Sequence, residues 1–150
     1  MYVRQLVISL VAVTLASAAT ADDARAERRM LSLPNTEALG IPISDAVLVG
    51  DTLYLSGNGG IDFDTMVVPN DPKDEARLLM ENVKAVLALA DMTLDDLVSV
   101  TIYCPDLTLY GQFNEVYRSY FDGAYPARAF VGSGELLFGM RFEIQAIAVR

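Results

Sequence analysis

The sequence of 150 residues contains no histidine, no tryptophan and a single cysteine, Cys104. Without histidine, the chain lacks the commonest general base and the usual zinc ligand, which excludes Ser-His and Cys-His catalytic pairs. One cysteine also excludes a disulfide within the chain. Because Cys104 follows Val100 and Ile102 on an apolar stretch, we interpret it as a small core residue rather than as a nucleophile.

Basic residues are scarce as well. The chain has 11 lysines and arginines against 20 aspartates and glutamates, a formal net charge of −9. Phosphate backbones repel such a chain, so we expect no nucleic-acid partner. No Asp-x-Asp-x-Asp-Gly loop is present to hold a metal by carboxylates alone, and we expect no metal and no other cofactor. A local basic site for a small anion is compatible with this charge, and Arg128 with Arg141 is the candidate pair.

Residues 1–21 have the pattern of a secretory signal peptide. A short positive start precedes an uncharged, mostly apolar run over 5–16, and small residues then offer a cleavage site after Ala21. The alternative is an uncleaved membrane anchor, but a span needs about 20 apolar residues. We therefore expect an exported, periplasmic protein with no membrane attachment after cleavage. We predict a flexible lead-in or short helix over 22–33 and one domain over 34–150.

The first half of this domain predicts a hairpin and then a helix. Two apolar runs, Ala46–Val49 and 52–56, flank a Gly-Asp turn, and a glycine-rich loop (57–60) and a short strand (66–68) follow. Asp71 is a suitable helix N-cap, and the proline after it suits the first helical position. The predicted helix has one apolar face, made of Ala76, Leu79, Met80, Val83, Leu87 and Ala90. Its charged residues are expected to face solvent: Lys73, Glu75, Arg77 and Lys84.

The second half predicts a strand, a helix and two further strands. Leu97–Cys104 is a strand stopped by a proline, and 109–121 has helical spacing with an aromatic stripe that suits the core better than a cofactor site. The last strands begin at Arg128 and span 142–149. The predicted fold is α/β (α+β), a mixed sheet of about six strands with two helices on one face. No third layer remains to cover the other face, so we expect oligomerisation.

Two charged residues on the last two strands are candidates for a site. Arg128 opens an apolar run, and Glu143 shares one strand face with Gln145 by the two-residue period. An arginine at the mouth of one strand, near a carboxylate on another, suits a small carboxylate ligand, because the guanidinium fork matches both oxygens. The alternatives are a surface ion pair for Arg128 and, for Glu143, a half-buried carboxylate paired with Arg141 or Arg128.

Five short motifs occur in an order and spacing that resemble one known family. They are Pro42-Ile43-Ser44-Asp45-Ala46, Leu55-Ser56-Gly57-Asn58, Asn114-Glu115-Val116-Tyr117 with Phe121, Pro126-Ala127-Arg128, and the last strand from Glu143 to Val149. Together they extend over roughly residues 34–150. On these motifs the chain resembles the RidA (YjgF/YER057c/UK114) family of reactive-intermediate deaminases.

The resemblance implies a chorismate-mutase-like fold assembled as a homotrimer, with active sites in clefts between neighbouring subunits. It implies hydrolysis of 2-imino or enamine acids to 2-keto acids and ammonia, without a cofactor. Arg128 would anchor the substrate carboxylate, and Glu143 would lie close to the attacking water. Ser56 and Gly57 match the loop that lines the pocket, and Asn114 matches a helix asparagine near it. The alternative for these three residues is a capping or turn role.

Three positions depart from the family pattern. Ile43 stands where the family has a pocket tyrosine, Asn58 replaces a glutamine, and Phe130 replaces a residue that is often cysteine. The lost hydroxyl and the added bulk predict a pocket for a substrate of different size or polarity. A second hypothesis is a non-catalytic protein that uses the same cleft to bind a small carboxylate, or a holdase. A ribonuclease, described for some relatives, is disfavoured by the acidic charge and the missing histidine.

Overall fold

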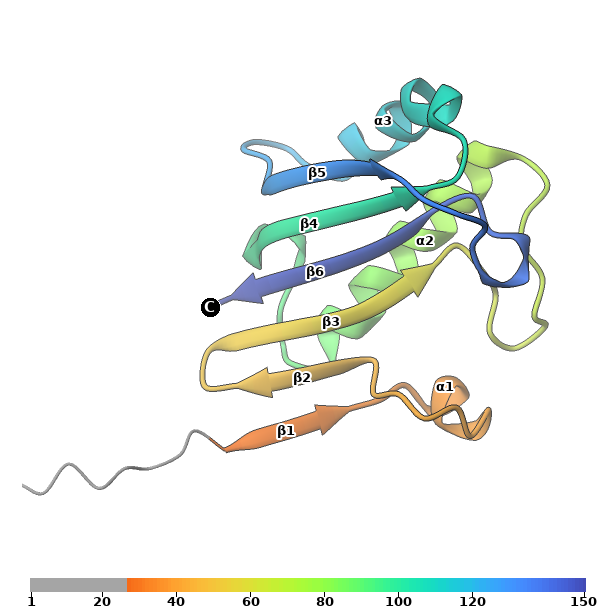
Figure 1. The fold of residues 1–150 in the computed structure, drawn as a ribbon. Coiled ribbons are helices and arrows are strands. Elements are labelled where there is room, and N and C mark those ends of the chain that lie inside the picture. Colours follow the sequence, from red (N-terminus) through yellow and green to blue (C-terminus); the bar gives the residue numbers. More distant parts are fainter. Residues whose placement is uncertain (1–26) are drawn as a thin grey trace, which may run out of the picture.

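The computed structural model describes residues 27–150, so the predicted signal peptide (1–21) lies outside the described residues. Within them, a six-stranded mixed sheet carries two long helices on one of its faces (Figure 1). The strands are β1 (Arg28–Leu31), β2 (Ala46–Val49), β3 (Thr52–Gly59), β4 (Leu97–Cys104), β5 (Ala127–Gly132) and β6 (Glu143–Val149). The α-helices are α1 (Pro34–Ala38), α2 (Pro72–Ala88) and α3 (Tyr110–Arg118), and short 3-10 helices occur at Leu94–Asp96, Leu107–Leu109 and Leu137–Gly139.

The strands lie in the order β1-β2-β3-β6-β4-β5. β4 and β5 run parallel, and a parallel pair needs a crossover connection, which α3 provides. α2 connects β3 to β4, and the last strand, β6, inserts between those two and is antiparallel to both. The predicted class, a mixed sheet of about six strands with two helices on one face, is therefore confirmed.

α2 begins as the sequence predicts. The carboxylate of Asp71 accepts hydrogen bonds from the backbone N–H groups of Lys73 (2.8 Å) and Asp74 (3.2 Å). Pro72, directly after Asp71, occupies the first helical position. All six residues predicted for its apolar face are buried in the core. Glu75, predicted to face solvent, is fully buried instead, because its carboxylate pairs with Arg141 just before β6.

The second helix and the cysteine also lie in the core. α3 ends at Arg118, earlier than predicted, and it buries Phe113 and Tyr117 against the sheet. The thiol of Cys104 is fully buried and donates to the backbone oxygen of Asp106 (3.1 Å). Burial raises the pKa of this thiol, which is the environment of an inert core cysteine rather than of a nucleophile.

Three predictions about the N-terminal half were wrong. Residues Arg28–Leu31, expected in a flexible lead-in or short helix, form β1 and pair antiparallel with β2. Residues 66–68 form no strand; they contribute one bridge, from Val67 to Asp62, after a turn in which Met66 has a positive φ of 58°. The glycine-rich segment is not a loop, because β3 continues through it to Gly59, with a register shift that marks a bulge.

The sheet face opposite the helices has no second layer among the described residues. Tyr54 of β3 is 49% exposed there, and Gln145 of β6 accepts a long hydrogen bond from the Tyr103 hydroxyl (3.4 Å). A shallow hollow of about 200 Å³ crosses β3, β6 and β4 on this face. Within residues 27–150, no helix is both long and apolar enough to cross a membrane.

Candidate functional site

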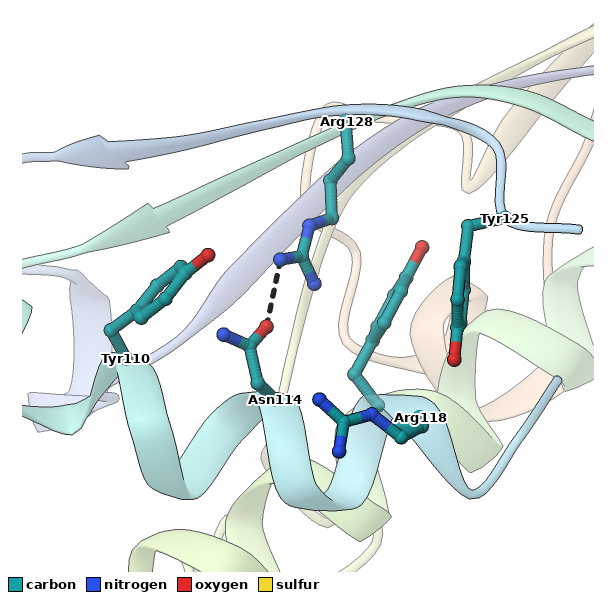
Figure 2. Close-up of a pocket in the computed structure, with 6 residues that line it drawn as sticks. Tyr110, Asn114, Arg118, Tyr125 and Arg128 are labelled. Carbon is teal, nitrogen blue, oxygen red and sulfur yellow. Dashed lines mark hydrogen bonds between the residues drawn. The ribbon is translucent and has the colours of Figure 1, made fainter.

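Arg128 lies near the start of β5, on the face of the sheet that packs against the helices. In the pairing of β4 with β5, Arg128 lies beside Val100, whose side chain is buried in the core. Paired residues of neighbouring strands face the same side of the sheet, so Arg128 faces the helices too. Its Nη2 donates to Oδ1 of Asn114 on α3 (2.7 Å), and its guanidinium carbon lies 4.6 Å from the centre of the Tyr117 ring. Figure 2 shows Arg128 reaching from the strand toward α3, where Asn114 meets it. Arg128 therefore binds an amide and an aromatic face rather than the carboxylate of a surface ion pair.

A pocket of about 260 Å³ opens beside this pair (Figure 2). Two arginines, three tyrosines and one amide line it: Arg118, Arg128, Tyr110, Tyr117, Tyr125 and Asn114. None of these six side chains is a carboxylate. Burial raises the pKa of Tyr117 to about 12, despite the nearby charge of Arg128, so this hydroxyl stays protonated. The pocket is thus rich in hydrogen-bond donors and positive charge, the character of an anion site.

The basic pair of this site differs from the predicted one. Arg141 does not take part, because its Nε lies 2.7 Å from the buried carboxylate of Glu75 and its Nη2 donates to the backbone oxygens of Asn70 (3.0 Å) and Pro69. The second guanidinium of the pocket belongs to Arg118. The sequence carried a usable signal for it, since residues four apart on a helix share a face, and Arg118 follows Asn114 by four.

Glu143, the other predicted catalytic residue, lies on the opposite face of the sheet. It is aligned with Tyr103 of β4, whereas the helix-facing residues of that strand are Val100, Ile102 and Cys104. Among the described residues, Glu143 forms no ion pair with Arg141 or Arg128. The alternative prediction, a carboxylate paired with one of these arginines, is therefore wrong. Burial raises the pKa of this carboxyl above its ordinary value. Within one chain, therefore, Arg128 and Glu143 do not share a site.

Gly57 provides the space that the Glu143 carboxylate occupies. A methyl group added at Gly57 would collide with Oε1 of Glu143 and crowd its carboxyl carbon. The predicted pocket residue Gly57 therefore lies against Glu143 rather than Arg128, and a side chain at position 57 would force the flexible end of Glu143 to move. The bulge of β3 sets this position, because the pairing with β6 shifts between Leu55 and Asn58.

The remaining predicted residues make local contacts. The Ser56 hydroxyl donates to the backbone oxygen of Ser44 (2.6 Å). The buried Asn58 donates from Nδ2 to the backbone oxygen of Ser56 (2.8 Å). The Ser56 hydroxyl thus ties β3 to the segment before β2, which is neither the capping nor the turn role given as the alternative for Ser56. Ile43 is 50% exposed in the loop before β2.

Phe130 packs edge-on against Tyr110, with ring centres 5.0 Å apart, and against Phe113 at 5.5 Å. It shares the helix-facing side of β5 with Arg128 and adjoins one wall of the anion pocket. The structure thus brings together Arg128, Asn114 and Phe130 on one face, and Glu143 with Gly57 on the other.

Comparison with known proteins adds independent evidence. Residues 37–150 match the sequence model of the family described as Endoribonuclease L-PSP. The chain is 36% identical over 124 residues to the mouse 2-iminobutanoate/2-iminopropanoate deaminase, which covers 82% of this chain and 92% of the mouse protein. It is 36% identical over 112 residues to the putative reactive intermediate deaminase TdcF of Escherichia coli K12, with coverage of 73% and 87%.

Solved structures agree with these relatives. The crystal structure of E. coli TdcF with bound serine superposes with a TM-score of 0.71 at 33% identity, covering 81% of this chain and 94% of TdcF. The YjgF gene product of E. coli superposes with a TM-score of 0.76 at 30% identity, covering 81% of this chain and 98% of that chain. Together with the sheet topology and the matched residues, these similarities show that the chain belongs to the RidA (YjgF/YER057c/UK114) family.

Proposed function

We propose that this protein hydrolyses reactive 2-imino or enamine acids to 2-keto acids and ammonia, and that Arg128 anchors the substrate carboxylate. The observation that carries the proposal is the half-buried guanidinium of Arg128, which Asn114 holds at 2.7 Å in a pocket without carboxylates. The names of the mouse and E. coli relatives, an imine deaminase and a reactive intermediate deaminase, support the reaction class.

The reaction requires little of the site beyond positioning the imine carbon and one water molecule. Water adds to the imine carbon and gives one proton to the nitrogen, which forms a carbinolamine. The hydroxyl proton of the carbinolamine then also moves to the nitrogen as the carbon–nitrogen bond breaks, which leaves a carbonyl group and ammonia. An anchored carboxylate fixes the imine carbon, so that one bound water attacks it in a defined direction. A carboxylate whose pKa is raised by burial, as at Glu143, is a better base for the water proton than an exposed one.

In this proposal, the Arg128 and Glu143 of one active site come from neighbouring copies of the chain. The two residues lie on opposite faces of the sheet, so a cleft between subunits is the arrangement that unites them. The uncovered sheet face, with Tyr54 49% exposed, supports assembly through that face, and a homotrimer is the state that we propose. Export to the periplasm belongs to the proposal too, and its support is the pattern of residues 1–21 alone.

The test is a coupled assay on the purified protein. An amino-acid oxidase generates 2-iminopropanoate from alanine in the presence of semicarbazide, and formation of the semicarbazone is followed. We expect the wild type to suppress semicarbazone formation and Arg128→Ala to lose that effect. Arg77→Ala is the matched control, because Arg77 is an exposed arginine of α2 that pairs with Asp74 outside the pocket. Size-exclusion chromatography checks that Arg128→Ala keeps the wild-type oligomer; full activity of an intact Arg128→Ala protein would overturn the proposal.

A non-catalytic carboxylate-binding protein is the second candidate. One observation favours it: the anion pocket of Arg128, Asn114 and Arg118 is complete within one chain, whereas Glu143 is remote from it. Such a protein would gain thermal stability from 2-oxobutanoate without any turnover of imino acids. Thermal unfolding with and without this acid, measured beside the assay, separates the two candidates.

A further inference from the structure

The anion pocket contains a second guanidinium that a simple 2-imino acid does not need. Arg118, in the last turn of α3, lines the same pocket as Arg128 on β5 (Figure 2). Neither arginine forms an ion pair with any carboxylate of residues 27–150. The four ion pairs of that part of the chain use other cations: Lys73, Arg77, Lys84 and Arg141.

Arg118 and Arg128 form no ion pair within residues 27–150, although the chain has 20 acidic residues against 11 basic ones. Arg118 is exposed and Arg128 is half-buried, so water screens part of the repulsion between the two guanidinium groups, and an anion bound between them relieves the rest. A single carboxylate fills the donor fork of one arginine, because its two oxygens match one guanidinium. The second guanidinium would then remain without a partner, so the charge of this pocket fits a ligand with two negative groups.

The rest of the lining supplies further donors. Oδ1 of Asn114 accepts from Arg128, which leaves the Nδ2 group of the same amide as a donor. Tyr110 and Tyr125 are 48% and 53% exposed, and their hydroxyl groups form no hydrogen bond to another side chain or to the backbone of residues 27–150. The pocket has a volume of about 260 Å³. Covalently bonded atoms take less room than separate waters at roughly 30 Å³ each, so a four- or five-carbon diacid fits.

We propose that Arg118 binds a second carboxylate of the ligand, so that the preferred substrates are 2-imino dicarboxylic acids, those formed from acidic amino acids. This inference rests on the proposed function and adds the substrate class. Arg128 binds the carboxylate next to the imine carbon, and Arg118 binds the carboxylate at the far end. Arg118 is therefore a specificity-determining residue, which selects acidic over apolar side chains.

Arg118 also has a purely structural explanation. A cation in the last turn of a helix interacts favourably with the helix dipole, and this holds for Arg118 on α3. If Arg118 has only this structural role, its loss lowers folding stability and changes the affinity for every ligand by the same factor. The two explanations therefore differ in one quantity, the ratio of affinities for a diacid and a monoacid of similar length.

The test is isothermal titration with two stable keto acids, 2-oxoglutarate and 2-oxobutanoate. We expect the wild type to bind 2-oxoglutarate at least tenfold more tightly. Arg118→Ala should weaken 2-oxoglutarate binding by about 10- to 100-fold, the range of one charge-assisted contact, and change 2-oxobutanoate binding much less. Arg118→Lys should restore part of the preference, and Arg77→Ala, which removes a charge elsewhere, should leave it unchanged. Equal affinities in the wild type, or equal weakening of both acids by Arg118→Ala, would overturn the inference.

The semicarbazide assay separates this inference from the proposed function. Imines made from glutamate and from alanine are compared, and we expect faster hydrolysis of the glutamate imine, with the difference lost in Arg118→Ala. Hydrolysis of both imines at equal rates would overturn the substrate preference and support the deaminase. Hydrolysis of neither imine, with the diacid still bound more tightly, would overturn the deaminase and support diacid recognition by Arg118.

Discussion

Glu75 on α2, which is fully buried, forms an ion pair with the partly exposed Arg141 before β6, with 2.7 Å between Oε2 and Nε. The other oxygen of Glu75 accepts from the backbone N–H groups of Arg141 (2.6 Å) and Phe142 (3.0 Å). Arg141 also binds the backbone oxygens of the segment before α2. One fully buried carboxylate thus ties α2 to the start of β6, two residues before Glu143.

Glu75→Ala should therefore be strongly destabilising. The substitution removes the acceptor of a partly exposed guanidinium and of two backbone N–H groups. Loss of one partner of a buried pair costs about 3–5 kcal/mol, and we expect the lower figure because the Arg141 side chain is 29% exposed. Urea unfolding at fixed protein concentration measures this cost. Glu81→Ala is the control, because its pair with Lys84 is exposed and is worth at most about 1 kcal/mol. Similar losses for the two variants would contradict the role of Glu75.

Features that local chemistry determines were predictable from the sequence. Asp71 and the proline after it define the start of α2, and apolar spacing defines the buried face of that helix. Arg128 was identified from its position at the start of a strand and from family motifs. Such signals depend on neighbours within a few residues, which the sequence displays directly.

Features that depend on distant partners were not predictable. Glu75 lies among charged helix residues, and nothing in the neighbouring sequence indicates that it accepts a hydrogen bond from Arg141, 66 residues away. The residues of β1 are exposed or half-buried, so no apolar alternation marks them as a strand. Alternation assigned Glu143 to one face of its strand, but only the pairing with β4 shows that Arg128 lies on the other.

Glu143→Gln should change the pH dependence of stability in a defined direction. Burial raises the pKa of Glu143 in the folded protein, so this group stabilises the fold most below its ordinary pKa of 4.5, and the contribution is lost as the pH rises through the folded pKa. Compared with wild type, Glu143→Gln should therefore be as stable or more stable at pH 8, with a difference that shrinks toward pH 4.5. Thermal unfolding across this range gives the difference.

Glu81→Gln provides a control of opposite sign. The hydrogen bond from Lys84 lowers the pKa of Glu81, so its contribution is present above the ordinary pKa and is lost as the pH falls through the folded pKa. Glu81→Gln should be less stable than wild type at pH 8, and that difference should shrink in acid. The same sign for both variants would mean that Glu143 is not desolvated in the assembled protein.

Gly57→Ala should destabilise the protein through Glu143 specifically. The added methyl group displaces the Glu143 carboxylate, which ends a flexible side chain and can move, so the loss should be small. It should disappear when Glu143 is shortened to alanine, with a coupling of about 0.5–1 kcal/mol, the low end of the range for residues in contact. Urea unfolding of the two single variants and the double variant measures this coupling. Gly59→Ala is the control, because its methyl group would meet Met140 instead, and Glu143→Ala should not relieve its cost. Additive effects for Gly57 and Glu143 would contradict the contact.

Asn114→Asp should weaken carboxylate binding more than Asn114→Ala does. Asn114 Oδ1 lies 2.7 Å from Nη2 of Arg128, so an aspartate there forms an ion pair inside the pocket and competes with the ligand for the same donors. Alanine removes the orienting contact but leaves the charge of Arg128 free. We expect about a tenfold loss of 2-oxobutanoate affinity for Asn114→Ala and about a hundredfold loss for Asn114→Asp, measured by isothermal titration. Circular dichroism checks that both variants are folded. If Asn114→Asp bound the acid as tightly as Asn114→Ala, the carboxylate would not be held by Arg128, because a competing anion beside that guanidinium would then have no effect.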